Sequence, residues 1–174
     1  MPFWSDPSVE PKLSFRWYAS FGFGTTNVIS SYTLRSFQKP SFEIAASEYL
    51  WLNDVAYRPG ILTWNPIEIT ITDVEDIFEN NTRKLYSILQ RAGYQTADPV
   101  NKPKSAIEKK AASEALGNDL RLIQINSSGG AIEEWVLKNP FITTVNFGQA
   151  NYGAEEIMTI SLGLRYDWAE HNIK

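Results

Sequence analysis

The segment from Met158 to Trp168 alternates without a break between two kinds of side chain. Its apolar positions are Met158, Ile160, Leu162, Leu164, Tyr166 and Trp168, and its small or polar positions are Thr159, Ser161, Gly163, Arg165 and Asp167. A period of two is typical of a β-strand with one buried face, because successive side chains point to opposite sides of the sheet. We therefore expect a strand that packs one face and presents the other to water.

Strand-like runs recur along most of the chain. Alternation, or enrichment in β-branched and aromatic residues, predicts further strands at Lys12–Phe21, Val28–Phe37, Ser41–Ala45, Glu48–Leu52, Ile61–Thr72, Leu120–Ile125, Glu133–Leu137, Phe141–Phe147 and Glu155–Trp168. Glycine and proline predict turns at Gly22–Gly24, Tyr57–Gly60 and Ser127–Gly130. Pro66, inside one of these runs, indicates an edge strand or a bulge.

The apolar spacing changes to three and four residues after Asp73. Asp73 can cap a first helical turn and Gly93 can end the helix, so a helix is predicted from Asp73 to Ala92. A weaker helical stretch is predicted at Ser105–Leu116, where Ser105 begins a capping-box pattern; a flexible loop is the alternative.

Together these elements predict one domain over residues 1–174. The expected fold is mainly β, a two-layer antiparallel β-sandwich or partial barrel with one packed α-helix. Residues 1–11 read as an extended, proline-containing N-terminal arm, and residues 94–117 as a long polar loop or weak helix.

Composition excludes several classes of function. The chain has no cysteine, so a disulfide framework, a thiolate zinc site and a cysteine nucleophile are ruled out. A net charge of −4 disfavours tight binding to nucleic acid through its phosphates. The first residues do not resemble a secretory signal and no apolar run has the length of a membrane span, so folding in a cytoplasm is expected.

No catalytic, cofactor-binding or metal site is predicted. The acids Asp73, Glu75, Asp76 and Glu79 suit the first turn of a helix better than a metal, and the single histidine, His171, is expected in a solvated tail. The glycine-rich segments lack the sequence patterns that bind phosphate. Four lysines interleaved with alanine and acids are expected on a solvated face; they are Lys102, Lys104, Lys109 and Lys110. A contact of these lysines with an adjacent subunit is the alternative.

Several separated stretches resemble the tail tube proteins of contractile-tailed, T4-like bacteriophages. They are the pattern W-x-L-x-N-P-F-I-x-x-V-x-F-G from Trp135, the strand ending L-R-Y-D-W at Trp168, the run Leu62–Thr70, the opening Asp6–Pro11 and the segment Lys104–Ile107. The resemblance covers about Asp6 to Trp168.

The resemblance implies a non-enzymatic virion subunit without cofactors. Copies would form hexameric rings whose sheets join into one inner β-barrel, and stacked rings would form the tube that conducts DNA into the host. Expected partners are the tail sheath, baseplate, tail terminator and tape-measure proteins, with assembly in the host cytoplasm. DNA would pass without tight binding, because a net acidic wall repels it.

Within this interpretation, the wet and candidate lumen-facing positions are Thr159, Ser161, Gly163, Arg165 and Asp167. The N-terminal arm and the loop 94–117 are expected to order on ring stacking, so deleting Pro2 to Pro11 should weaken polymerisation and leave the fold intact. Alternatives are a baseplate tube or tube-initiator protein, a type VI secretion or tailocin-type tube subunit, and, in another class, a carbohydrate- or ligand-binding β-barrel module.

Overall fold

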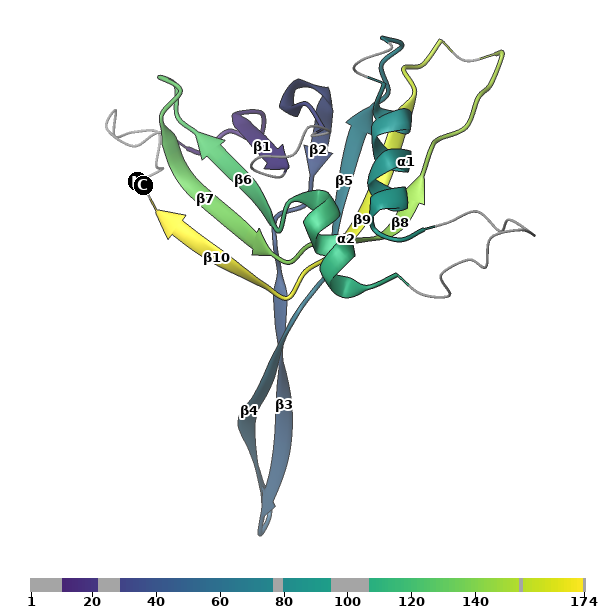
Figure 1. Cartoon of the computed structure of the whole chain (residues 1–174). Helices are drawn as coiled ribbons and strands as arrows, with labels where there is room; N and C mark the ends of the chain where they lie inside the picture. Colours follow the sequence, from purple (N-terminus) through teal and green to yellow (C-terminus); the bar gives the residue numbers. More distant parts are fainter. Residues whose placement is uncertain (1–10, 22–28, 77–79, 95–106, 154, 174) are drawn as a thin grey trace, which may run out of the picture.

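The computed structural model describes residues 11–21, 29–76, 80–94, 107–153 and 155–173 (Figure 1). These residues form a body of two four-stranded antiparallel sheets, from which a two-stranded hairpin projects. The mainly β, antiparallel sandwich predicted from the sequence is confirmed. The arm residues 1–10 and residues 95–106 of the loop predicted at 94–117 lie outside the described residues.

Each sheet is assembled from strands that are distant in sequence. Sheet A has the order β1 (Trp17–Phe21), β6 (Asp119–Ile125), β7 (Ala131–Lys138), β10 (Trp168–Ile173). Sheet B has the order β2 (Leu34–Phe37), β5 (Ile67–Thr72), β9 (Thr159–Arg165), β8 (Phe141–Asn146). The hairpin pairs β3 (Phe42–Trp51) with β4 (Asp54–Trp64), and the helical elements are the 3-10 turn η2 (Ser31–Thr33), α1 (Asn81–Arg91) and α2 (Lys109–Leu116).

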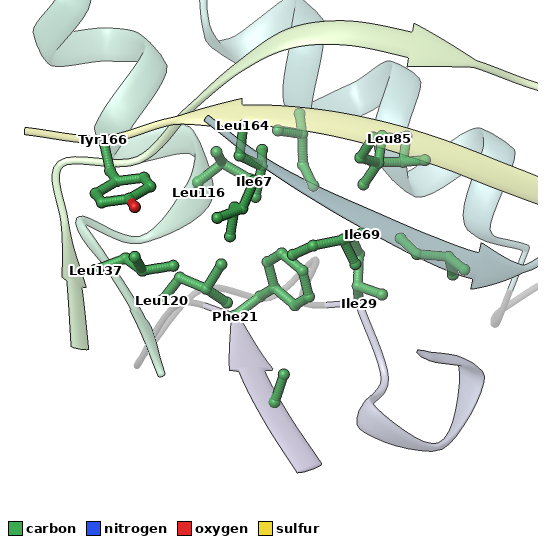
Figure 2. Packing of buried hydrophobic residues seen from close by; sticks show 14 of the residues in the cluster. Phe21, Ile29, Ile67, Ile69, Leu85, Leu116, Leu120, Leu137, Leu164 and Tyr166 are labelled. Carbon is green, nitrogen blue, oxygen red and sulfur yellow. The ribbon is translucent and has the colours of Figure 1, made fainter. Parts of the chain in front are cut away.

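The core lies between the two sheets and the helices. Every second residue of the central strands of sheet B is buried: Ile67, Ile69 and Ile71 in β5, and Ile160, Leu162 and Leu164 in β9. Figure 2 shows side chains from sheet A, Phe21, Leu120 and Leu137, lying against Ile67 and Ile69. Full burial of one such side chain contributes about 1.5–3 kcal/mol, so the period of two read from the sequence is also the energetic basis of the sandwich.

The helices cover the core-facing side of sheet B. Leu85 and Ile88 of α1 and Leu116 of α2 belong to the same buried cluster as the sheets. Helix α1 begins at Asn81, and not at the predicted Asp73, because β5 continues to Thr72 and the side chain of Asn80 accepts from the backbone N–H of Arg83 as the cap. Asp73 still binds the first turn of α1, since its carboxylate accepts a hydrogen bond from the hydroxyl of Thr82 at 2.8 Å.

The second helix is present at Lys109–Leu116 and ends at the expected glycine. Gly117 has φ 90°, the left-handed conformation that closes a helix without a Cβ penalty. The capping residue is Glu108, which makes no side-chain cap. The predicted capping serine, Ser105, lies outside the described residues.

The region predicted as two short strands and a turn is one long hairpin. β3 is continuous, and the segment Tyr57–Gly60 lies inside β4 as part of an irregular pairing, so the predicted turn is wrong. Pro59 is tolerated inside β4 because both strands of a free two-stranded ribbon are edge strands. A Cβ on Gly60 would come within 3.0 Å of the carbonyl oxygen of Ala45. The true turn follows Trp51 and places Leu52 at φ 55°.

The strand predicted from Glu155 to Trp168 is two strands in two sheets. β9 ends at Arg165, and Trp168 begins β10, which pairs with β7 of sheet A. His171 therefore lies in a strand opposite Trp135 and not in a tail, although its side chain is exposed as predicted. The turn at Asp167 could not be read from the alternation, which continues through it.

Two of the crossings between the sheets, β7 to β8 and β9 to β10, occur at one corner. The chain passes from β7 to β8 at Asn139, with φ 52°, and from β9 to β10 at Asp167. The Asp167 carboxylate accepts from Asn139 Nδ2 at 2.9 Å and from Lys109 Nζ of α2 at 2.7 Å. The ammonium of Lys109, and then the amide of Asn139, lower the pKa of Asp167 below its ordinary value. One side chain thus fastens both crossings and α2.

Replacing Asp167 with Ala should therefore destabilise the fold. The change leaves Asn139 and Lys109 without their acceptor, and we expect the free energy of unfolding to fall by about 1–2 kcal/mol in urea denaturation at pH 7. Asp54→Ala, at the exposed turn of the hairpin, is the matched control and should change it by less than about 0.5 kcal/mol. Equal effects of the two substitutions would contradict the role given to Asp167.

Candidate assembly surfaces

The outward face of sheet B is polar and is not covered by either helix. The face consists of Glu68, Thr70 and Thr72 of β5, Thr159, Ser161 and Gly163 of β9, and Thr144 and Asn146 of β8. All of these residues are exposed or half-buried, whereas their neighbours in β5 and β9 are buried against the core. We call this surface the polar face.

The structure brings together three of the five residues predicted to be wet. Thr159, Ser161 and Gly163 lie in a row on the polar face. Arg165 is exposed at the end of β9 and borders a hollow between the helices and β8. Asp167 is not part of the face, because the chain has turned toward sheet A before it and its carboxylate binds Lys109 and Asn139.

The prediction missed the contribution of β5 and β8 to this face. Ile67, Ile69 and Ile71 alternate with Glu68, Thr70 and Thr72 as regularly as the residues of β9 do, so the signal for β5 was present in the sequence. In β8 a register shift between Ile142 and Thr144 hides the alternation.

Gly163 allows β8 to approach closely at that shift. A Cβ on Gly163 would stand 3.3 Å from atoms of both Thr143 and Thr144, and Thr143 Oγ1 donates to the Gly163 carbonyl at 3.0 Å. A larger residue would push the edge strand away.

Sheet B ends in two edge strands, β2 and β8, that no described segment covers. β8 carries no charged residue or proline in Phe141–Asn146, although such residues commonly protect an edge from pairing with another chain. Because β2, β5, β9 and β8 are antiparallel to one another in turn, the two edge strands run in opposite directions. An edge β8 of one copy and an edge β2 of another could therefore pair and continue the antiparallel order.

The hairpin β3–β4 presents a concentration of exposed apolar side chains. It extends away from the body, with no third strand beside it (Figure 1). Its exposed large apolar residues are Phe42, Ile44, Tyr49, Leu50, Trp51, Leu52, Val55, Tyr57, Ile61 and Leu62. Leu52 at the tip is 90% exposed. An isolated two-stranded ribbon is marginally stable in water, and exposed apolar surface of this kind is typical of a site that contacts another molecule.

The root of the hairpin is fixed to the body. The ring of Trp64 lies 5.3 Å from that of Phe42 and 5.9 Å from that of Tyr166 at the end of β9. The backbone N–H of Asn65 donates to the carbonyl of Ser41 at 2.9 Å. The direction in which the ribbon leaves the body is thus set by aromatic packing.

A buried carboxylate fastens the hairpin root and the N-terminal segment to sheet A. Glu133 of β7, whose side chain is 8% exposed, accepts from Lys12 Nζ, from Trp135 Nε1 at 2.6 Å and from Lys39 Nζ at 3.2 Å. His171 Nε2 lies 3.6 Å from the same carboxylate, and its ring packs on Trp135 with centroids 4.5 Å apart. Lys12, with Trp135 and Lys39, lowers the pKa of Glu133 to about 2.

Two of the lysines predicted on a solvated face have partners within the chain, and the other two fall outside the described residues. Lys109 binds Asp167, and Lys110 lies 3.8 Å from Glu114 one helical turn away; Lys102, Lys104 and Glu79 are not described. Among the described residues, no group of three or more His, Cys, Asp or Glu could hold a metal ion. No helix in the described ranges has the length and apolarity needed to cross a membrane.

A hollow of about 590 Å³ lies between α1, α2 and the strands β8 and β9. Its lining is mainly aliphatic, with Ile88, Leu89 and Leu116 from the helices, and Phe141 and Tyr166 from the strands. Tyr166 thus lines this hollow together with residues of α1.

The environment of Glu133 predicts a specific dependence of stability on pH. Because the folded-state pKa of about 2 lies below the ordinary 4.5, the stabilisation is fully present above pH 4.5 and is lost as the pH falls toward 2. We expect Glu133→Gln to lower the free energy of unfolding by about 2 kcal/mol at pH 7, and the difference from the unmodified protein to shrink between pH 4.5 and 2. Urea denaturation across this range measures it, with the exposed Glu48→Gln as control; a difference independent of pH would contradict the assignment.

No protein-family model matches the chain, and no curated protein matches it in sequence. Solved structures match in fold. A chain of the PVC extracellular contractile injection system, from the sheath–tube complex in its extended state, aligns with a TM-score of 0.67 at 15% identity, over 94% of this chain and 93% of that chain.

Two further matches come from the anti-feeding prophage. A chain of its tube-terminating cap aligns with a TM-score of 0.67 at 15% identity over 100% of both chains. A chain of its baseplate aligns with a TM-score of 0.66 at 11% identity, over 94% of this chain and 97% of that chain. The fold expected from the resemblance to contractile-tail tube proteins is therefore confirmed: this chain shares its fold with components of contractile injection particles.

Proposed function

We propose that this chain is the structural subunit of the inner tube of a contractile tail, in which hexameric rings stack into a hollow conduit. The observation that carries the proposal is the pair of open edges of sheet B. Their opposite directions allow sheets of successive copies to join into one closed antiparallel barrel, which removes the exposed edges of sheet B. The subunit acts by assembling and performs no catalysis.

The polar face would line the lumen of such a barrel. It lies on the side of sheet B opposite the helices, so closing the sheet with the helices outside turns this face inward. It consists mainly of threonine, serine, asparagine and glycine with one acid, Glu68. A wall without a cationic array offers the phosphates of DNA no ion pairs, so a polyanion could slide through without being retained.

The hairpin would join one ring to the next. A ribbon of ten residues per strand reaches about 34 Å at roughly 3.4 Å per residue, far enough to lie along a subunit of an adjacent ring. Burial of Leu50, Leu52 and Ile61 there would supply apolar contact area that the isolated chain leaves in water.

Further partners follow from the proposed particle. A tube of this kind would contact a sheath outside, a baseplate and a terminator at its ends, and a tape-measure protein inside, and phage DNA would pass through it during ejection. A baseplate tube or tube-initiator protein and a type VI secretion or tailocin-type subunit remain the alternatives within this class. Unlimited tube growth by the purified chain would favour the main tube over an initiator.

The hollow between α1 and α2 is the observation that favours a ligand-binding module instead. Its volume lies within the range of small-molecule sites, about 300–1,000 Å³. Its lining is mainly apolar, and two of its charged members, Lys109 and Asp167, are bound to each other, which leaves few polar groups for the hydroxyls of a carbohydrate. An apolar ligand would fit better, and such a module would remain monomeric.

Negative-stain electron microscopy across a concentration series tests the proposed function. We expect rings at low and tubes at high concentration. The double substitution Leu50→Glu and Leu52→Glu should shift the tubes to single rings, because it places charge in an apolar contact, while circular dichroism remains unchanged. Tyr152→Glu, at a fully exposed position outside the hairpin, is the control. A monomer at every concentration would count against the proposal.

The lumen assignment is tested by giving the polar face a positive charge. Thr70→Lys combined with Ser161→Lys should make assembled tubes retain short DNA in a filter-binding assay, with affinity falling steeply as salt rises, because the lysines repeat in every copy. The unmodified tubes should not retain it. The control places two lysines on the outer face of sheet A, at Ser20 and Trp168. Equal retention of DNA inside tubes by both variants, judged by protection from nuclease, would exclude the polar face as the lumen wall.

A further inference from the structure

Tyr32 projects from the edge of sheet B on a firmly held turn. The residue lies in η2, directly before the edge strand β2, and is 71% exposed. On either side of it Ile29 and Thr33 are buried at 1% and 3% exposure, and the Thr33 hydroxyl donates to the Ser30 carbonyl at 2.8 Å. An exposed aromatic side chain on a preorganised backbone loses little conformational freedom on binding, which is typical of an interface anchor.

A hollow of about 510 Å³ lies beside the opposite edge of the same sheet. It is lined by Glu75, Asn80, Thr82, Arg83, Tyr86 and Phe147. Tyr86 of α1 and Phe147, which follows β8, are 39% and 37% exposed and supply aromatic surface. The remaining lining residues offer polar groups that a phenol hydroxyl could reach. We call this hollow the α1–β8 hollow.

The turn and the hollow lie at the same end of sheet B. Leu34 pairs with Ile71, and Ile71 pairs with Ile160. Asn146 pairs with Ser161, so the next residue of that strand, Phe147, comes level with Ile160. Phe147 and Leu34 are thus at one level on the two edges, and Figure 1 shows η2, the start of α1 and the end of β8 at the end of the body away from the hairpin.

We propose that Tyr32 of one copy inserts into the α1–β8 hollow of the next copy and sets the register of the joined sheets. This inference rests on the proposed function, because the two features face each other only when β8 of one copy pairs with β2 of another. Each copy then carries one aromatic anchor and one hollow, so the contact is head-to-tail and propagates around a ring.

Charge at the two edges supports this pairing. Arg35 is exposed in β2, three residues beyond Tyr32, and Glu75 is exposed in the lining of the hollow. A neighbouring β2 would bring the guanidinium of Arg35 toward the side of the hollow that holds this acid. Arg83 of α1, in the same lining, carries the same charge as Arg35, so the arrangement must keep the two guanidinium groups apart.

The absence of cysteine from the chain gives a clean crosslinking test. Assembled protein made from a mixture of Tyr32→Cys and Phe147→Cys subunits is treated with a short bis-maleimide and separated on a denaturing gel. Covalent dimers are expected from the mixture and not from either variant alone. The control mixture pairs Tyr32→Cys with Tyr18→Cys, an exposed position on sheet A, and should give none.

Assembly thresholds provide the second readout if a cysteine variant does not form rings. Tyr32→Ala should raise the protein concentration at which rings form about tenfold or more. Tyr32→Phe, which keeps the aromatic side chain, should leave this concentration within about threefold. Tyr18→Ala, the control on sheet A, should do the same. Rings seen by microscopy without a Tyr32–Phe147 crosslink, or an unchanged threshold for Tyr32→Ala, would overturn this inference and leave the proposed function standing. A wild-type chain that never forms rings would count against both.

Discussion

The carboxylate of Asp167 holds the two sheets of this molecule in their relative position. The chain leaves sheet A at Asn139 and returns to it after β9, and both crossings are tied to this one side chain. Lys109 adds α2 to the same corner, and the buried Tyr166 beside it reaches the aromatic root of the hairpin. This one corner therefore sets the positions of the polar face, the open edges and the hairpin relative to one another. A protein that repeats its contacts in every copy needs such a fixed frame, since a small error per copy would prevent a ring from closing.

The architecture was readable from the sequence wherever one face of a strand is buried. The alternation in β5 and β9, the helix around Leu85 and the glycine that closes α2 follow from periodicity and local backbone preferences. The hairpin was not readable in the same way. Its turn depends on Leu52 in a left-handed conformation, and its internal proline and glycine imitate a turn where the strands only shift register. Sequence patterns report burial, and this ribbon has no buried face within its own chain.

Candidate assembly residues were predictable from the sequence only where they lie on a strand that buries its other face. Thr159, Ser161 and Gly163 were found because their strand alternates, while Asp167 continued the alternation in sequence after the chain had changed sheets. Glu133 was not predictable, since its partners Lys12, Lys39 and His171 come from distant segments that only the tertiary structure unites. Fold comparison adds the class of particle from which similar chains come, and the surfaces described here supply physical reasons why such a chain would assemble.

The free hairpin has a consequence for how such particles would begin. Beyond its root, the ribbon gains little stability from its own body, so its ordering must draw on the free energy of its first contact with another copy. This cost recurs until a complete receiving surface exists. Addition to a finished ring meets a surface that is already formed, whereas the first ring has none. Growth is then slow to start and fast to continue, so the number of particles would be governed by the supply of a starting platform and not by the amount of subunit.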